Sequence, residues 1–394
     1  MLTIVIINLL IYNNIGDKVK GLYIHIPFCK SICSYCDFTK RVSSNVNYIR
    51  YIDRLLSEID SYKENLFDID TVYIGGGTPN VLPLNLLEKL FIKIQLYLDK
   101  SIENSIELNP ELIDEDLCKL LSKYKFNRAS IGVESINENS IKLLNRHHNK
   151  LDVINGVNYL RKNGIDNINI DMIFGIPNTN IDDLKYDLNF VLSLNPNHIS
   201  YYSLIVEDNT ILKYRIDNGL VKVLDDDLIA DMYDYIKETL NNNNYNHYEI
   251  SNFAKTGYES KHNQIYWNLD EYIGIGLGAS GYLNGYRYDN TKDFKAYFNR
   301  FKENDEYLTI EERKNEFMML GLRLIDGVSI SRYYEMFNSS IFDDFKVIDK
   351  LVNKGLLEIK GDKIRIPYDK IFLANLVWSE FVWKRKKKKL YFMN

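Results

Sequence analysis

The hydrophobic pattern between residues 21 and 204 alternates short β-branched runs with longer amphipathic stretches. Runs typical of buried strands occur at 21–26, 71–75, 104–108, 128–133, 167–173 and 198–204. Apolar residues at helical spacing predict helices at 46–63, 83–99, 114–124, 138–163 and 181–193. This alternation indicates parallel strands joined by right-handed crossovers. The six strand–helix units are fewer than the eight of a closed barrel, so we expect an α/β fold with a partial (β/α)6 barrel.

The pattern changes after residue 205. A helix is expected at 226–241, followed by strand-like sequence and by residues 262–286, which are rich in glycine and aromatic residues. From about residue 312 the apolar positions predict a smaller, mainly helical domain, in which 330–337, 342–354 and 356–366 resemble the helix, helix and hairpin of a winged helix. We therefore expect an N-terminal extension at 1–15, a core domain at 16–250, a connecting region at 251–310, a C-terminal domain at 311–383 and a basic tail at 384–394.

The composition is that of a folded protein rather than a disordered chain, with 394 residues of which 45% are hydrophobic. The formal net charge of −5 gives no electrostatic reason to expect nucleic-acid binding. The apolar start of the chain is shorter than the roughly 20 residues of a membrane-spanning helix, and it lacks the basic segment of a signal peptide. Four cysteines are typical of a reducing compartment, so we expect a soluble, cytoplasmic protein.

The basic run KRKKKK at 384–389 has three interpretations. A solvated terminus is the first, and attraction to anionic membrane lipid is the second. RNA binding is the third, for which so short a run is little support.

Three of the four cysteines, Cys29, Cys33 and Cys36, lie within eight residues after the first predicted strand. A closed zinc site needs four ligands, but Cys118 lies in a distant helical pattern and His25, on the preceding strand, is a less favoured fourth ligand. Three thiolates that leave one coordination position open suit a [4Fe–4S] cluster with an exchangeable ligand. Cys118 is interpreted as a small buried helix residue.

The segment YIHIPFCKSICSYCDF resembles the cluster loop of radical S-adenosylmethionine (SAM) enzymes. More narrowly, it resembles the oxygen-independent coproporphyrinogen III oxidase group and the heme-chaperone branch of that group. The resemblance extends from about residue 21 to 370, and it implies a radical SAM core at 16–250 and a HemN-like domain at 311–383. The supporting motifs are GGGTP (75–79), ELNPE (107–111), SIGVES (130–135), NIDMIFGIPN (169–178), YEISNFAKTGYESKHNQIYW (248–267) and YIGIGLGAS (272–280).

The glycine run at 75–77 has neither the lysine of a phosphate-binding loop nor the GxGxxG spacing of a dinucleotide site. The resemblance implies instead that this run binds the amino group of SAM and that Arg146 pairs with its carboxylate. Glu134 departs from the family, which usually has glutamine there, so we expect altered SAM affinity. The implied SAM contacts are Tyr23, Tyr35, Gly76, Gly77, Thr78, Glu107, Glu134, Arg146 and Asp171.

Two features separate the branches of this group. The decarboxylating oxidases carry a further cysteine two residues after the third, where this chain has Phe38. The chaperone branch carries HNxxYW, matched by residues 262–267, and the resemblance implies that His262 ligates heme iron. From the residues alone, a buried, hydrogen-bonded histidine is the alternative interpretation.

The remaining histidines have weaker interpretations. The branch often has histidine where this chain has Ser280, so His247 or Tyr282 would have to replace it. His147 and His148 are expected to be solvated or to cap a helix. His198 starts a predicted strand and is assigned no role.

The resemblance implies a heme chaperone that binds heme, a [4Fe–4S] cluster and SAM, and passes heme to an acceptor protein. It also implies an electron donor. Contact with a membrane would be made through the basic tail. No nucleic-acid partner is expected. The alternative is an oxygen-independent coproporphyrinogen III oxidase, which Phe38 disfavours. A radical SAM enzyme acting on an unrelated substrate is a third possibility. Whether SAM is cleaved or only bound is left open by the sequence.

Overall fold

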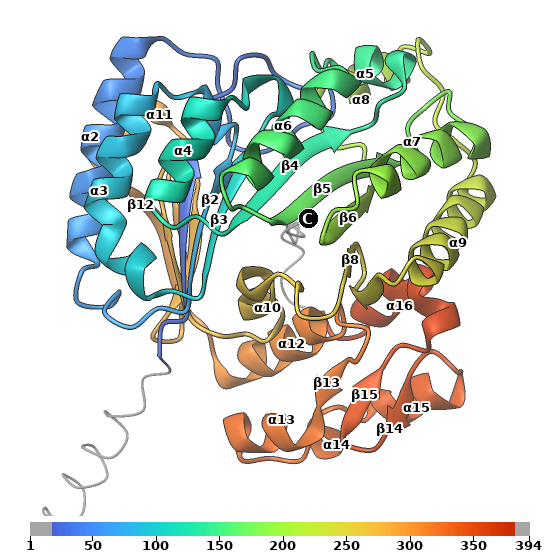
Figure 1. The fold of residues 1–394 in the computed structure, drawn as a ribbon. Coiled ribbons are helices and arrows are strands. Elements are labelled where there is room, and N and C mark those ends of the chain that lie inside the picture. Colours follow the sequence, from blue (N-terminus) through green and yellow to red (C-terminus); the bar gives the residue numbers. More distant parts are fainter. Residues whose placement is uncertain (1–17, 383–394) are drawn as a thin grey trace, which may run out of the picture.

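The computed structural model of this protein describes residues 18–382, so the predicted N-terminal extension and basic tail lie outside the described residues. Its centre is a curved sheet of parallel strands (Figure 1). Consecutive strands pair side by side in chain order, which confirms the predicted partial barrel. These strands are β1 (Gly21–Ile26), β2 (Thr71–Gly76), β3 (Glu103–Leu108), β4 (Arg128–Glu134), β5 (Asn167–Phe174) and β6 (His198–Ser203).

Helices cover the outer face of this sheet (Figure 1). They are α2 (Asn45–Ser61), α3 (Leu84–Lys100), α4 (Glu115–Lys123), α5 (Glu138–Leu144), α6 (Lys150–Lys162), α7 (Ile181–Ser193) and α9 (Asp226–Asn242). Each crossover returns the chain to the same edge, so the loops that follow the strands collect at one rim. Short helices occupy these and later loops: η1 (Pro79–Val81), η2 (Pro110–Leu112), α8 (Ile211–Asp217) and α11 (Phe294–Tyr297).

The prediction of one helix over 138–163 is wrong, because the chain breaks between α5 and α6. Asn145 ends α5 in the left-handed conformation with φ 59°, which asparagine tolerates better than most residues. Asn149 then caps α6, together with Asp152, in a reciprocal capping box. The break turns residues 145–149 away from a helical course and brings Arg146 into the site described below.

The sheet continues beyond the six parallel strands at both edges. The strand-like sequence expected after the helix at 226–241 forms the strands at one edge, whereas those at the other edge were not predicted. Beside β1 lie the parallel strand β9 (Tyr272–Ile275) and then the antiparallel strands β10 (Ser280–Leu283), β11 (Tyr286–Asn290) and β12 (Lys302–Tyr307). Beside β6 lie β8 (Asn252–Ala254) and β7 (Asn246–Glu249). The sequence does contain the Asn-Gly pair typical of a tight hairpin turn. Asn284 and Gly285 join β10 to β11 with φ of 52° and 78°.

The C-terminal domain follows the predicted winged-helix-like order, except that the helix expected at 342–354 is split in two. Its elements are α12 (Ile310–Gly321), β13 (Val328–Ser329), α13 (Ile330–Phe337), α14 (Ile341–Asp344), α15 (Val347–Asn353), β14 (Glu358–Lys360), β15 (Lys363–Arg365), η3 (Tyr368–Leu373) and α16 (Ala374–Trp378). It packs below α10 (Lys261–Trp267) (Figure 1). The Ile250 N–H donates to the Arg323 carbonyl at 3.1 Å, and Arg332 pairs with Asp270 at 2.8 Å. No helix among residues 18–382 is long and apolar enough to cross a membrane.

Candidate functional site

The loop that carries the three clustered cysteines follows β1 and is closed at its base by backbone hydrogen bonds. The Cys29 N–H donates to the Arg41 carbonyl at 3.0 Å, and the Arg41 N–H donates to the Pro27 carbonyl at 2.7 Å. Ser34 fixes the middle of the loop to the end of α5, because its N–H donates to the Leu144 carbonyl at 2.9 Å. The loop is therefore held between β1 and α5 at the rim where the parallel strands end.

The cysteines of this loop are free thiols in a partly desolvated setting. Cys29 is buried, whereas Cys33 and Cys36 are half-buried. Burial raises the pKa of Cys29 and raises that of Cys36 to about 12, against opposing effects that include nearby Lys40. Because iron binds thiolates, loading a metal group here must release protons.

The residues present fit a cluster better than a single metal ion. No group of three or more His, Cys, Asp or Glu side chains within residues 18–382 converges closely enough to hold one ion. A cluster places each cysteine on a different iron, so its thiolates stand farther apart. The candidate fourth zinc ligands are also engaged elsewhere: His25 shares hydrogen bonds with Tyr23 and with the Thr39 carbonyl, and Cys118 is buried in α4.

The glycine run after β2 lies directly against the cysteine loop. A Cβ on Gly77 would meet the Cys29 Sγ at 3.0 Å, so the missing side chain leaves room beside this sulfur. The Thr78 side chain hydrogen-bonds the same thiol. The Gly76 N–H, predicted to face SAM, instead donates to Glu107 at 2.8 Å. Gly76 has φ 113° and packs against the His25 ring, so it accepts no side chain.

Arg146 occupies the break between α5 and α6 and points at the cysteine loop. Its Nη1 lies 3.6 Å from the Cys33 Sγ and 3.3 Å from the Asn109 Oδ1, and its Nη2 donates to the Gly132 carbonyl. Its buried Nε has no partner among the described residues. Arg146 therefore brings a half-buried positive charge, with an unused donor, next to one predicted cluster ligand.

Three half-buried carboxyl groups gather below the loop, at the ends of neighbouring strands. Glu107 accepts hydrogen bonds from Tyr73 and Gly76, and Asp171 accepts one from Ser130 at 2.7 Å. Burial, with a smaller contribution from the nearby Asp171 carboxyl, raises the pKa of Glu107 to about 7. Burial is also the main cause that raises the pKa of Asp171.

Glu134 is the third of these carboxyl groups. Burial raises its pKa to about 7, against the opposing effect of Arg146. The Tyr35 side chain hydrogen-bonds it, and Tyr35 packs against the apolar cluster around Leu144. The structure thus brings together the predicted residues from β1 to β5, and the carboxyl groups favour a cationic ligand such as a sulfonium or ammonium group.

Substituting glutamine for Glu134 provides a test of this environment. The Glu134 carboxyl ionises near pH 4.5 in the unfolded chain but near 7 in the folded protein. Wild-type stability therefore falls as the pH rises through this range, because the unfolded state gives up its proton first. We expect Glu134→Gln to stabilise the protein by about 1–3 kcal/mol at pH 8 relative to pH 5. Urea unfolding at both pH values measures this, with exposed Glu64→Gln as the control; an equal effect at both pH values would contradict it.

His262 lies at the opposite end of the sheet from the cysteine loop. Its Nδ1 shares a hydrogen bond with Thr71 at 2.6 Å, and its Nε2 shares one with Tyr266 at 2.7 Å. Its N–H donates to Glu103 at 3.0 Å, and Thr71 and Glu103 are the first residues of β2 and β3. Burial lowers the pKa of the ring to about 3. The structure shows the buried, hydrogen-bonded alternative, and iron ligation would require the ring to leave both partners.

The other histidines differ in exposure. His148 is buried and shares a hydrogen bond with the Ser135 carbonyl at 3.1 Å, so the prediction that it is solvated or a cap is wrong. His147 is exposed, as expected. His247 is buried and stacks on Phe253.

The residues around Ser280 provide no evident heme ligand either. The Ser280 hydroxyl donates to Asp289, on β11. Tyr282 is buried in the sheet, opposite Tyr272. The predicted substitutes, His247 and Tyr282, are therefore both core residues in this conformation.

The sequence analysis did not identify the polar side chains that form hydrogen bonds with the predicted site residues. Tyr73, Asn109, Ser130 and Asn169 hydrogen-bond Glu107, Arg146 or Asp171. Asn109 lies within the ELNPE motif, so its place in that motif was a signal. The other three are strand residues whose orientation depends on the register of the sheet.

The three-cysteine loop on an open parallel barrel defines the radical SAM class. Residues 23–191 match the radical SAM superfamily, and residues 308–367 match the HemN C-terminal domain. The fold is similar to that of HemN from Escherichia coli, a coproporphyrinogen III oxidase and radical SAM enzyme, with a TM-score of 0.79. That similarity covers 93% of this chain and 90% of HemN at 21% identity, so it shows the shared fold.

Comparison with curated relatives identifies the family within this superfamily. The chain is 38% identical to heme chaperone HemW of Lactococcus lactis, covering 93% of this chain and 98% of the relative. It is 34% identical to heme chaperone HemW of Bacillus subtilis, covering 92% and 99% of the two chains. It is 30% identical to heme chaperone HemW of Escherichia coli, covering 91% and 97%. The chain therefore belongs to the HemW family of the radical SAM superfamily.

Proposed function

We propose that this protein is a heme chaperone that binds a [4Fe–4S] cluster, SAM and heme, and passes heme to an acceptor protein. The observation that carries the proposal is the cysteine loop, which holds three thiols close to the carboxyl groups at the strand ends and has Phe38 two residues after Cys36. Phe38 is half exposed at 50% and supplies no further thiol. The name of the curated relatives supports the heme-transfer part.

The residues of this chain have separate roles in the proposal. Cys29, Cys33 and Cys36 hold the cluster, which when bound supplies one electron at low potential to the sulfonium of SAM. The ionised forms of Glu107 and Glu134 attract the cationic groups of SAM, so its affinity increases as the pH rises through about 7.

Residues at the cysteine loop also orient the ligand. The unused Nε donor of Arg146 would be available to the carboxylate of SAM. Thr78 and the open space at Gly77 fix the position of the Cys29 sulfur. The cytoplasm, a reducing compartment, suits such a thiol site.

The second candidate function is oxygen-independent coproporphyrinogen III oxidase, which the fold shared with HemN favours. Side-by-side assays separate the two. We expect the anaerobically reconstituted protein to bind hemin in a one-to-one ratio and to convert no coproporphyrinogen III. Absorption titration measures the first result, and chromatography of the porphyrins measures the second. Turnover of the porphyrinogen, with or without hemin binding, would contradict the chaperone proposal.

A further inference from the structure

The outward face of α3 carries large apolar side chains that are exposed to solvent. Ile92 and Leu96 are four residues apart, so they lie in one row on the surface of the helix. The row leads to the end of α3, where the Lys100 ammonium lies 4.3 Å from the centre of the Phe67 ring. Ile102 follows two residues later. We call Phe67, Ile92, Leu96 and Ile102 the α3 strip; each of these side chains is between 58% and 72% exposed.

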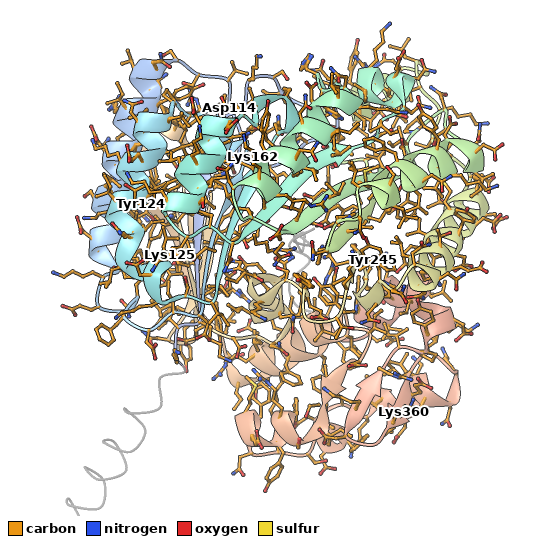
Figure 2. The ribbon with its side chains drawn as sticks, in the orientation of Figure 1. Asp114, Tyr124, Lys125, Lys162, Tyr245 and Lys360 are labelled. Carbon is orange, nitrogen blue, oxygen red and sulfur yellow. The ribbon has the colours of Figure 1, made fainter. Side chains whose placement is uncertain are left out.

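Ion pairs border the α3 strip on both sides, toward α2 on one side and toward α4 and the turn after it on the other. They are Lys89–Asp53, Lys93–Asp60, Lys123–Glu88 and Lys125–Asp99, at 2.5 to 2.7 Å. Figure 2 labels Lys125, the cation of the last pair. Because the charges beside the strip are neutralised within the protein, the strip suits an uncharged, apolar partner.

The described chain begins beside one end of the α3 strip. Its first residue, Lys18, pairs with Asp70 at 3.1 Å, and Asp70 follows Phe67 by three residues. The Ile102 N–H donates to the Asp70 carbonyl at 2.9 Å. Figure 1 shows the start of the described chain at the end of the sheet where α3 ends. The point at which residues 1–17 join the fold is therefore next to Phe67 and Ile102.

The sequence before Lys18 has the composition that the α3 strip suits. The run MLTIVIINLLIYNN at 1–14 contains no charged residue, and most of its positions up to Tyr12 are apolar. Twelve residues span about 18 Å as a helix or about 40 Å as a strand, and α3 from Ile92 to its end spans about 12 Å. Residues 13–17 add about 16 Å of extended chain between the two. The segment is therefore long enough to cover the strip from the point where it joins the fold.

We propose that the N-terminal segment of this chain, residues 1–14, binds the α3 strip and covers its apolar side chains. Contact between the two removes from water two sets of apolar side chains that would otherwise be exposed. The segment is covalently attached beside the strip, so its effective concentration there is high and favours it over a partner from solution. The inference goes beyond the proposed function, because it needs neither cluster nor heme.

Limited proteolysis of the full chain tests whether the segment is covered. The variant Ile92→Lys/Leu96→Lys places two charges on the α3 strip and leaves the core intact, because both residues are exposed. The control Leu151→Lys/Leu376→Lys makes the same charge change at similarly exposed leucines on α6 and α16. The probe is chymotrypsin, which cleaves after Tyr12 and the leucines before it. Intact-mass measurement follows the loss of the N-terminal residues with time.

We expect the wild type and the control to lose the segment about 10-fold or more slowly than the strip variant, because the segment must leave the strip before it is cleaved. The control should stay within about 2-fold of the wild type. Circular dichroism should show all three proteins equally folded. Equal cleavage rates in the strip variant and the wild type, whether fast or slow, would overturn the proposal.

Photo-cross-linking locates the segment without any change to the α3 strip. The photoreactive residue p-benzoylphenylalanine replaces Tyr12 in the full chain, and mass spectrometry of the digest identifies its partners. We expect partners within residues 84–102 or at Phe67, and an equal mixture with isotopically labelled protein should show that both peptides come from one chain. Cross-links elsewhere, between two copies, or none at all would overturn the proposal. A membrane is the competing occupant, so loss of these cross-links on binding to vesicles of equal parts phosphatidylglycerol and phosphatidylcholine would also overturn it.

Discussion

Replacing any one of Cys29, Cys33 and Cys36 with alanine is expected to abolish the reconstituted cluster. In the proposed site each thiolate would hold a different iron, and no other cysteine or histidine among the described residues is placed to substitute. Both ring nitrogens of His25 are engaged in hydrogen bonds, with Tyr23 and with the Thr39 carbonyl, and Cys118 is buried in α4. Iron and sulfide analysis, with the visible absorption of the cluster, should give less than about one tenth of the wild-type content.

Cys118→Ala is the matched control, because it removes a buried cysteine that lies outside the loop. We expect it to retain full cluster content and to lose only some stability, by about 1 kcal/mol. Circular dichroism should show all four variants folded. A full cluster in any one loop variant would refute the assignment of that ligand.

Replacing His262 with alanine is expected to lower the free energy of unfolding by about 3–5 kcal/mol. The substitution leaves the Thr71 hydroxyl and the Tyr266 hydroxyl buried without their partner, and it empties a space against the Tyr73 ring. Urea unfolding at pH 7 measures the loss. The low pKa of the buried ring keeps His262 neutral there, so no charge is removed.

His147→Ala is the comparison, since His147 is exposed, and we expect it to change stability by less than about 0.5 kcal/mol. Heme titration of the folded fraction of both variants shows whether either ring contributes to the heme spectrum. A stable His262→Ala protein with a shifted heme spectrum would contradict the structural role and restore His262 as a heme ligand.

Much of the fold was predictable because its parallel strands are buried on both faces. Such strands read as continuous apolar runs, and β1 and α7 were predicted with the bounds that the structure has. The edge strands β9 to β12 were not predicted, because β9 pairs with β1 across about 250 residues of chain. The close approach of β10 to Gly274 explains the glycine there, which the sequence alone could not assign to a sheet.

The break between α5 and α6 shows the limit of periodicity. Leu144 and Val153 continue one apolar pattern across the break, and both are buried. The asparagines at 145 and 149 carried the local signal for a helix end and a helix start. Only the three-dimensional structure shows why the break is there, since it places Arg146 against Cys33.

The candidate site was predictable as a set of residues but not as a set of interactions. The motifs named the cysteines and carboxylates in advance, and the structure gathers them at one rim. The hydrogen bond from the Gly76 N–H to the Glu107 carboxylate depends on the register of β2 against β3. That His262 is buried depends on Thr71, 191 residues earlier in the chain. Such contacts across the chain have no local signature.

The central claim is that the three-cysteine loop holds a [4Fe–4S] cluster with one iron open to SAM. Electron paramagnetic resonance of the dithionite-reduced, reconstituted protein, with and without SAM, tests this directly. We predict a signal of a reduced [4Fe–4S] cluster whose g values shift when SAM is added, because SAM ligates the open iron. A signal that SAM leaves unchanged, at a SAM concentration that saturates binding by calorimetry, would contradict the claim.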